Sequence, residues 1–224
     1  MATSSIRFPN ESDEYRAARD ALLQEEIALR KQIADVAAMR QQLPMGGVAK
    51  DFAFEEVQNG SVKESRLSNL FAEGKDTLIL YSYMFGPDNE SPCPMCTGIL
   101  DGLNGQALHL SQRVNVAVEG KSPAQRLQDL ADSRDWKHLR LVSSEKNAYH
   151  DDYFGQTPDG VQMPMCNVFE KTADGIRHFY GSEMLYAGLD GDPRHMDLMF
   201  PLWNFLDLTR GGRGTSWYPS LSYD

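Results

Sequence analysis

The sequence predicts an α/β fold in which a mixed sheet follows a long helix and a hairpin. Apolar runs of strand length alternate with helix-like segments from about residue 77 onward, which is typical of parallel strands joined by helices. The pair Asn59-Gly60 separates two short extended runs, a strong local indication of a hairpin. Residues 11–43 carry apolar side chains at helical spacing, which indicates the helix.

The composition is that of an ordinary globular protein, with 41% hydrophobic and 24% charged residues among 224, enough for one domain with an extension. The formal net charge of −10 argues against nucleic acid or a membrane surface as a partner, because both attract Lys and Arg. Three cysteines are too few for a disulfide-stapled secreted scaffold. No segment has the character of a signal peptide or a membrane span, so we expect a cytoplasmic protein.

The helix expected over residues 11–43 includes Leu22 and Ile33 among its apolar residues, with charged residues between them. Pro44 and the glycines that follow end it. We expect residues 1–46 to form a helical extension that packs on the domain or pairs with a second copy in a homodimer.

Residues 47–210 are expected to form the domain, and residues 211–224 a C-terminal tail. Strands are predicted from short apolar runs, and helices from apolar spacing with start signals such as Ser122-Pro123. In chain order, the expected elements are strands 51–57, 61–64 and 77–85, a helix 93–110, a strand 114–118, a helix from about 123 to 134, strands 139–143, 166–170 and 176–180, and a helix 194–208.

The motif Cys93-Pro94-Met95-Cys96 directly follows the apolar strand 77–85 and opens a helix. At a helix N-terminus, unpaired N–H groups and the helix dipole stabilise a thiolate, so Cys93 is the expected nucleophile. Cys96 lies one turn further in and is the expected resolving thiol, which closes an intramolecular disulfide. Pro94 suits the first helical turn, where its missing N–H is no loss. This pattern predicts a redox-active centre.

These elements together resemble the thioredoxin fold over roughly residues 51–208. The resemblance rests on the strand–Cys-x-x-Cys–helix unit, on Met163-Pro164 just before the strand 166–170, and on the hairpin and helix that follow. It implies an α/β/α sandwich in which Pro164 is a cis-proline facing the cysteines. Pro94, Met95, Met163 and Pro164 would then contact the substrate. The leading hairpin resembles the entry segment of peroxiredoxins.

Several runs resemble, more specifically, a bacterial family known only as domain-of-unknown-function family eight-nine-nine, whose members are thioredoxin-like. Besides the N-terminal helix and the cysteine motif, they are Tyr83-Met84-Phe85-Gly86-Pro87, Ile176-Arg177-His178-Phe179-Tyr180-Gly181 and Pro201-Leu202-Trp203-Asn204. The resemblance spans nearly the whole chain. It implies a fold and a redox site but names no substrate.

The chain departs from the thioredoxin pattern at three places. Ser91-Pro92, and no Trp, precedes Cys93, and strand 77–85 holds no carboxylate that could take a proton from Cys96. Cys166 adds a third thiol two residues beyond the proline; a small buried hydrophobe is the simpler interpretation of it.

We therefore expect a thiol–disulfide oxidoreductase that acts on a protein or small-molecule thiol or disulfide. No organic cofactor is implied, because no Gly-rich phosphate loop follows a strand. A peroxiredoxin-like thiol peroxidase is one alternative, although the spacing from Pro87 to Cys93 is one residue shorter than that family's motif. A non-catalytic scaffold is another, because a fold does not confer an activity.

Binding of Cu(I) or Zn(II) by the cysteines is an alternative from a different class, because thiolates suit both ions. Cys166 or a histidine would complete the site, and His150 is favoured among the histidines by its place before Pro164. The main interpretation includes no metal. The aromatic loop 149–154 could form a wall of a substrate groove, or be a solvated loop with anchoring aromatic residues.

Overall fold

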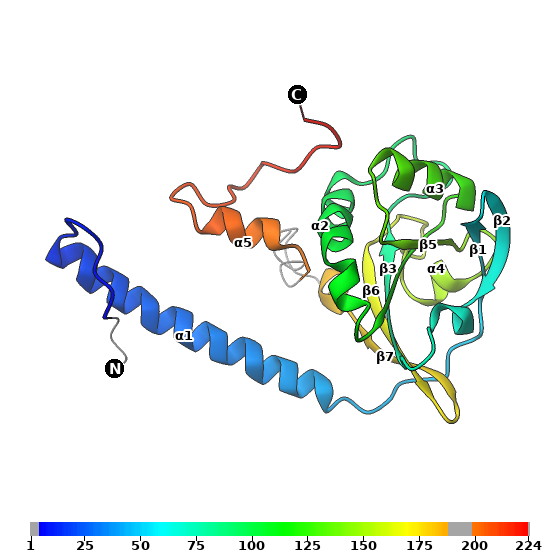
Figure 1. Ribbon diagram of the computed structural model, residues 1–224, viewed down its shortest axis with the longest axis horizontal. Helices are drawn as coiled ribbons and strands as arrows, with labels where there is room; N and C mark the ends of the chain where they lie inside the picture. Colours follow the sequence, from blue (N-terminus) through cyan, green and yellow to red (C-terminus); the bar gives the residue numbers. More distant parts are fainter. Residues whose placement is uncertain (1–4, 188–198, 224) are drawn as a thin grey trace. The chain divides into compact units, whose positions relative to one another are not determined.

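The computed structural model describes residues 5–187 and 199–223. The chain divides into two compact units, Met1–Pro44 and Met45–Asp224. The first unit is built around helix α1 (Asp13–Gln41), whose start is capped where Ser12 Oγ accepts a hydrogen bond from the Tyr15 N–H at 3.1 Å (Figure 1). Acidic residues in the first turn add to this cap, because the helix N-terminus carries partial positive charge.

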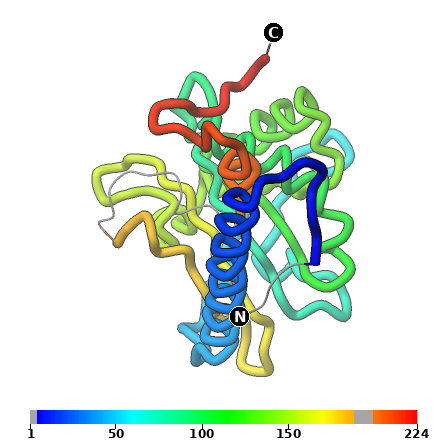
Figure 2. The backbone as a smooth tube through the Cα atoms, turned by 90° about the vertical axis from the view of Figure 1, so that its left-hand side faces the viewer, coloured from blue at the N-terminus to red at the C-terminus, as the bar shows by residue number. Residues whose placement is uncertain are grey.

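The second unit is built on a seven-stranded sheet with the strand order β2-β1-β5-β4-β3-β6-β7 (Figure 1). Strands β3, β4 and β5 are parallel, and every other neighbouring pair is antiparallel. The hairpin β6–β7 (yellow in Figure 2) forms one edge of the sheet. The strands are β1 (Ala53–Gln58), β2 (Ser61–Arg66), β3 (Thr77–Tyr83), β4 (Asn115–Gly120), β5 (Arg140–Ser143), β6 (Met165–Thr172) and β7 (Gly175–Gly181).

Helices cover both faces of this sheet. On one face, here called the α2 face, α2 (Pro94–Leu110), α3 (Ala124–Ser133) and α5 (Pro201–Asp207) contribute to one buried cluster, which includes Tyr81, Tyr83, Cys96, Leu100, Leu127, Val118 and Trp203. The opposite face, the α4 face, is covered by α4 (Tyr149–Asp152) and the short helix η1 (Leu67–Leu70), with Phe54, Leu78, Leu80, Ala117 and Phe169 in a second cluster.

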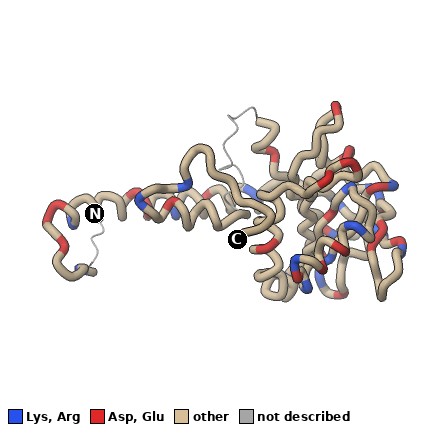
Figure 3. Tube along the Cα trace, turned by 90° about the horizontal axis from the view of Figure 1, so that it is seen from above, with Lys and Arg blue, Asp and Glu red and all other residues tan. Residues whose placement is uncertain are grey.

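Alternation along the strands decides which side chain belongs to which face. On β3, Tyr81 and Tyr83 point to the α2 face, whereas Leu78 and Leu80 point to the α4 face. Lys and Arg are interspersed with Asp and Glu along the chain (Figure 3). This architecture is the thioredoxin-like α/β/α sandwich with a mixed sheet, hairpin and long N-terminal helix that the sequence predicts.

Two expectations need adjustment. The segment expected as a loop between strands 139–143 and 166–170 contains the short helix α4, whose residue Tyr149 is completely buried. Of the helix expected over 194–208, residues 199–208 are described and form α5 from Pro201 to Asp207. Residues 194–198 of that expectation lie outside the described residues.

Candidate functional site

The loop between β3 and α2 delivers Cys93 to the helix N-terminus. Cys93 is the N-cap residue of α2, and its N–H donates to the carbonyl of Met84 at 3.1 Å. The preceding loop is fastened by Arg126 of α3, whose guanidinium donates to the carbonyls of residues 86, 87, 89 and 90. The same guanidinium lies 4.2 Å from the centroid of the Phe85 ring. The loop before the cysteines is therefore tied to α3, a helix that follows them in the chain.

The first turn of α2 directs hydrogen bonds at Cys93. The N–H of Cys96 donates to Cys93 Sγ at 3.5 Å, and the N–H and hydroxyl of Thr97 donate to the Cys93 carbonyl at 2.9 and 2.8 Å. Cys93 is half-buried and Cys96 is buried, and both are free thiols. The structure thus brings the two predicted cysteines together, with Cys93 nearer to solvent.

The pKa values of the two thiols move in opposite directions. The pKa of Cys93 falls to about 6, chiefly because the Cys96 thiol donates a hydrogen bond to it; the backbone N–H groups of Cys96 and Met95 add to this, against burial. The pKa of Cys96 rises well above its usual 9.0, because it gives that hydrogen bond, is buried and lies beside the Cys93 charge. At neutral pH, Cys93 is therefore a thiolate and Cys96 a thiol.

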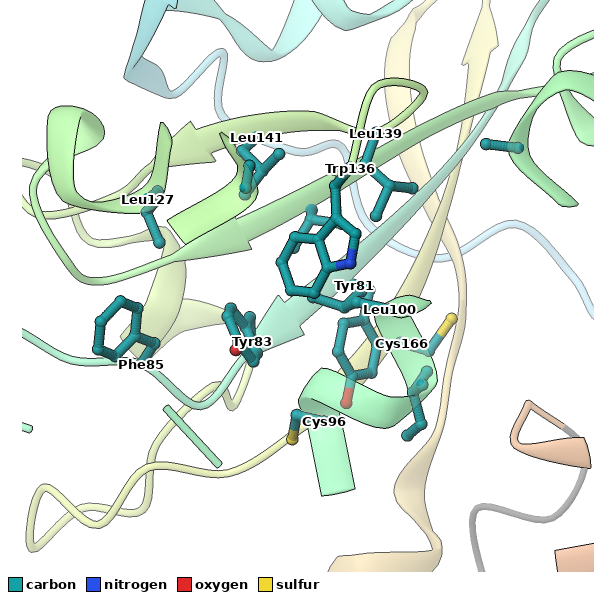
Figure 4. Packing of buried hydrophobic residues seen from close by; sticks show 14 of the residues in the cluster. Tyr81, Tyr83, Phe85, Cys96, Leu100, Leu127, Trp136, Leu139, Leu141 and Cys166 are labelled. Atoms are coloured by element: carbon teal, nitrogen blue, oxygen red, sulfur yellow. The ribbon is translucent and has the colours of Figure 1, made fainter. Parts of the chain in front are cut away.

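Two tyrosines of β3 lie beneath this turn, and Figure 4 shows both between the sheet and α2. Tyr83 places its hydroxyl 2.6 Å from Thr97 Oγ1, which ties the sheet to the hydrogen bonds on Cys93. Tyr81 is buried beside Cys96. Sequence reasoning missed Tyr81, Tyr83, Thr97 and Arg126; the alternation of the predicted strand could have placed both tyrosines on one face.

The peptide bond before Pro164 is trans, so the expectation of a cis-proline is wrong. Trans is the intrinsically favoured isomer, and cis persists only where the surroundings impose it. Here the chain before the proline belongs to a closed loop, in which the Met163 N–H donates to the Gly155 carbonyl at 2.7 Å and Gln156 pairs with Gln162. Both Met163 and Pro164 are partly exposed.

A cavity of about 430 Å³ is lined by residues of this loop and of the loop that leads to Cys93. Met84, Gly86, Asn89 and Gln162 are among the residues that line it. Met163 and Pro164 follow Gln162 directly in the chain, but neither they nor the cysteines line this cavity.

The third thiol, Cys166, lies on β6 directly opposite Tyr81 of β3 and therefore on the α2 face. It is buried, and burial raises its pKa to about 12. A thiol with that pKa stays protonated at neutral pH and is a poor nucleophile, consistent with its expectation as a small buried hydrophobe.

His150 lies on the other side of the sheet from the cysteines. Its Nδ1 is 2.9 Å from Glu119 Oε1, the same oxygen that accepts a hydrogen bond from Ser144 Oγ, and all three side chains are fully buried. Glu119 follows Ala117 by two residues on β4, which places it on the α4 face. The suggestion that His150 joins the cysteines in a metal site is therefore wrong, because the sheet separates them.

The aromatic loop 149–154 likewise belongs to the α4 face, where Tyr149 and Tyr153 stack at 5.0 Å between ring centroids. Its residues Asp152, Tyr153 and Phe154 line a cavity of about 830 Å³, but neither Cys93 nor Cys96 lines that cavity. Within the described residues, no group of three or more His, Cys, Asp and Glu side chains is arranged to hold a metal ion. Of the chain's histidines, which could in principle bind a metal, His195 lies outside the described residues.

Among the described residues, no helix is long and apolar enough to cross a membrane.

Several solved structures are similar to this chain. Peroxidoxin BcpB from Mycobacterium tuberculosis is 17% identical with a TM-score of 0.45, over 71% of this chain and 96% of that one. The mitochondrial 2-Cys peroxiredoxin from Plasmodium falciparum is 16% identical with a TM-score of 0.46, over 62% and 81%. An uncharacterized conserved protein from Geobacillus kaustophilus is 15% identical with a TM-score of 0.45, over 62% and 69%.

No curated protein matches the sequence. A family model does, over residues 5–223, and this extent confirms the resemblance carried by the cysteine motif and the runs around it. The chain therefore belongs to the family described as bacterial protein of unknown function (DUF899).

Proposed function

We propose that the protein carries out thiol–disulfide exchange through Cys93 and Cys96. The observation that carries this proposal is the pairing of a partly exposed Cys93, held at a helix N-terminus by N–H groups, with a buried Cys96 one turn behind it. The first thiol is ionised at neutral pH and the second is not, which is the division of roles that exchange requires.

In the reducing direction, the Cys93 thiolate attacks one sulfur of a substrate disulfide. A bond forms between Cys93 Sγ and that sulfur, the substrate disulfide breaks, and the other substrate sulfur leaves as a thiolate that takes a proton from water. Cys96 then attacks Cys93 Sγ, its proton passes to the departing substrate sulfur, and the intramolecular disulfide forms. The substrate gains two electrons from the protein and two protons, one from water and one from Cys96.

The substrate partner is a protein or a small molecule that carries a disulfide or a thiol. Pro94 and Met95 lie between the cysteines, and Met163 and Pro164 continue from the loop that borders the 430 Å³ cavity. We propose these four residues as its docking surface. A trans Pro164 can fill this role because what the partner meets is the partly exposed side chains and backbone of the segment.

The test is a titration of the Cys93–Cys96 couple against glutathione on metal-free protein, with thiols counted by mass after alkylation. We expect a reversible two-electron transition between about −180 and −280 mV, the range of reducing and isomerising dithiol proteins. Absence of a reversible couple, together with close to one equivalent of copper or zinc in the protein as purified, would contradict the proposal and favour metal binding.

A further inference from the structure

The second half of the exchange requires a buried thiol, Cys96, to lose its proton beside the sulfur of Cys93. Thus a polar group near Cys96 must stabilise the charge. In the described part of the chain, the buried carboxylates are Glu56 and Glu119. Glu119 lies on the α4 face, and Glu56 is bound to Arg140 at 2.6 Å. Neither lies on the α2 face, so no buried carboxylate of the described residues is placed to assist Cys96.

Tyr81 is the polar residue that β3 places behind this thiol. It is 1% exposed and belongs to the same buried cluster as Cys96. In Figure 4 its ring extends from β3 toward the first turn of α2, and its hydroxyl oxygen lies on the side of Cys96. Although the two residues are far apart in the sequence, they lie close together because α2 packs over β3.

The Tyr81 hydroxyl forms no hydrogen bond of normal geometry with any described residue. A buried hydroxyl without a partner is unfavourable, because it has lost its hydrogen bonds to water. Tyr83, on the same face, differs, since its hydroxyl lies 2.6 Å from Thr97 Oγ1. The Tyr81 hydroxyl thus has no partner of normal geometry in the reduced protein, and the Cys96 sulfur is a neighbour that could accept from it once a charge forms there.

We propose that the Tyr81 hydroxyl donates a hydrogen bond to the Cys96 sulfur as this sulfur becomes a thiolate, and that it thereby accelerates the closing step of the proposed exchange on which this inference rests. In that step a bond forms between the sulfurs of Cys96 and Cys93. The bond between Cys93 and the substrate sulfur breaks, and the Cys96 proton goes to the departing substrate thiolate. Tyr81 keeps its own proton and contributes only the hydrogen bond.

The pKa shifts of Tyr81 and Cys96 agree with Tyr81 as the hydrogen-bond donor and Cys96 as the group that ionises. Burial and the neighbouring thiols raise the pKa of Tyr81 well above its usual 10.0, so the phenol remains a donor at neutral pH. The hydrogen bond that Cys96 gives to Cys93, and burial, raise the pKa of Cys96; the Tyr81 hydroxyl acts in the opposite direction. Removing the hydroxyl should therefore make Cys96 harder to ionise and leave Cys93 almost unaffected.

The test follows the two phases of thionitrobenzoate release from the disulfide of Ellman's reagent. Cys93 attack releases the first equivalent, and Cys96 attack on the mixed disulfide releases the second. In Tyr81→Phe we expect an unchanged first phase and a second phase slowed about tenfold, equivalent to about 1.4 kcal/mol, as suits a lost hydrogen bond to a charged group. Tyr149→Phe is the matched control, because it removes an equally buried, unpartnered hydroxyl from the α4 face.

The outcomes separate this inference from the function on which it rests. Equal second-phase rates in Tyr81→Phe, Tyr149→Phe and the unmodified protein would overturn the role of Tyr81 and leave the dithiol mechanism in place. Slowing of both phases in Tyr81→Phe would also overturn it, since that result indicates a change in packing. An unmodified protein that releases no second equivalent would instead contradict the proposed function.

A second variant keeps the side chain nearly intact. Site-specific replacement of Tyr81 by 3-fluorotyrosine gives a more acidic hydroxyl, which is a stronger donor. We expect the pH midpoint of the second phase to fall in this protein and to rise in Tyr81→Phe, with no change in the first phase. A role in packing alone would not move the two midpoints in opposite directions, so equal midpoints would overturn the inference.

Discussion

On the α2 face of the sheet, the buried thiols Cys96 and Cys166 and the phenols Tyr81 and Tyr83 lie near the helix N-terminus that carries the partly exposed Cys93. On the α4 face, a carboxylate and an imidazole, Glu119 and His150, are completely buried and bonded to each other. The first face keeps one thiol ionised and reactive. On the second face, the Glu119 carboxylate accepts a hydrogen bond from Ser144 Oγ and pairs with His150 Nδ1.

This difference indicates a division of labour between chemistry and stability. Glu119 and His150 are residue types common in catalytic sites, yet both side chains are completely buried, and the contact between them joins α4 to β4. The cysteine pair has fewer hydrogen bonds and partial exposure, and it is the pair placed to react. Burial, more than residue type, separates the two roles.

The largest expected effect tests the α2 face directly. Cys93→Ser should reduce disulfide exchange to the background rate, because the serine hydroxyl is not ionised at neutral pH. Cys96→Ser should instead form a mixed disulfide with the substrate and stop after one half-reaction, measurable by intact mass. Equal residual turnover in both variants would contradict the assignment of Cys93 as nucleophile and Cys96 as resolving thiol.

The corresponding disruption of the α4 face is Glu119→Ala. It leaves His150 Nδ1 and Ser144 Oγ without their acceptor in a fully buried site, so the free energy of unfolding should fall by about 3–5 kcal/mol. Urea denaturation measures this, and Glu64→Ala, on the exposed strand β2, is the control. Cys93 alkylation in the folded protein should keep its rate; a slowed alkylation would mean that the two faces are coupled.

Substitutions at two glycines, one beside His150 and one in α2, compare how tightly the two faces are packed. A Cβ on Gly155 would lie 2.5 Å from His150 Nδ1, so Gly155→Ala should destabilise the protein by about 1–3 kcal/mol. A Cβ on Gly102, inside the cysteine helix, meets nothing within 4 Å, so Gly102→Ala should stabilise it by about 0.5–1 kcal/mol. Thermal unfolding of both variants tests this, and the same sign of change in both would refute the packing argument.

The smallest effect concerns pH. With a Cys93 pKa of about 6, its alkylation rate should fall about tenfold between pH 7 and pH 5 as the thiolate is protonated. Because this pKa is lowered from 9.0, ionised Cys93 stabilises the reduced protein fully above about pH 9, and this contribution disappears as pH falls through about 6. Cys96→Ala removes the main cause of the shift, so the midpoint should rise; an unmoved midpoint would disprove that cause.

The sequence predicted those parts of the molecule that local patterns determine. Apolar runs and helix signals located β3, α2 and the hairpin strands, and the Cys-x-x-Cys spacing placed Cys93 at the start of a helix. The alternation within β3 also contained the position of Tyr81 on the α2 face. The sequence also showed that this strand holds no carboxylate for Cys96; that the buried Tyr81 hydroxyl lacks a partner of normal geometry is visible only in the folded protein.

The remaining features depend on contacts between distant residues. Glu119 and His150 are 31 residues apart, and neither side chain carries a local sign that they would meet on the face opposite the cysteines. The isomer of Pro164 depends on the loop closed by Met163 and Gly155, which no motif describes. The short helix α4 forms in a polar segment because Tyr149 packs into the aromatic cluster around Phe54 and Phe169.

Arg126 has a consequence for how the protein is degraded. A protease must draw a stretch of extended chain into its active site, and exposed loops are its usual targets. The loop between β3 and α2 is exposed in part, yet one guanidinium holds four of its carbonyls and covers the Phe85 ring. Limited proteolysis should therefore spare the segment before Cys93, and Arg126→Ala should make it a cleavage site.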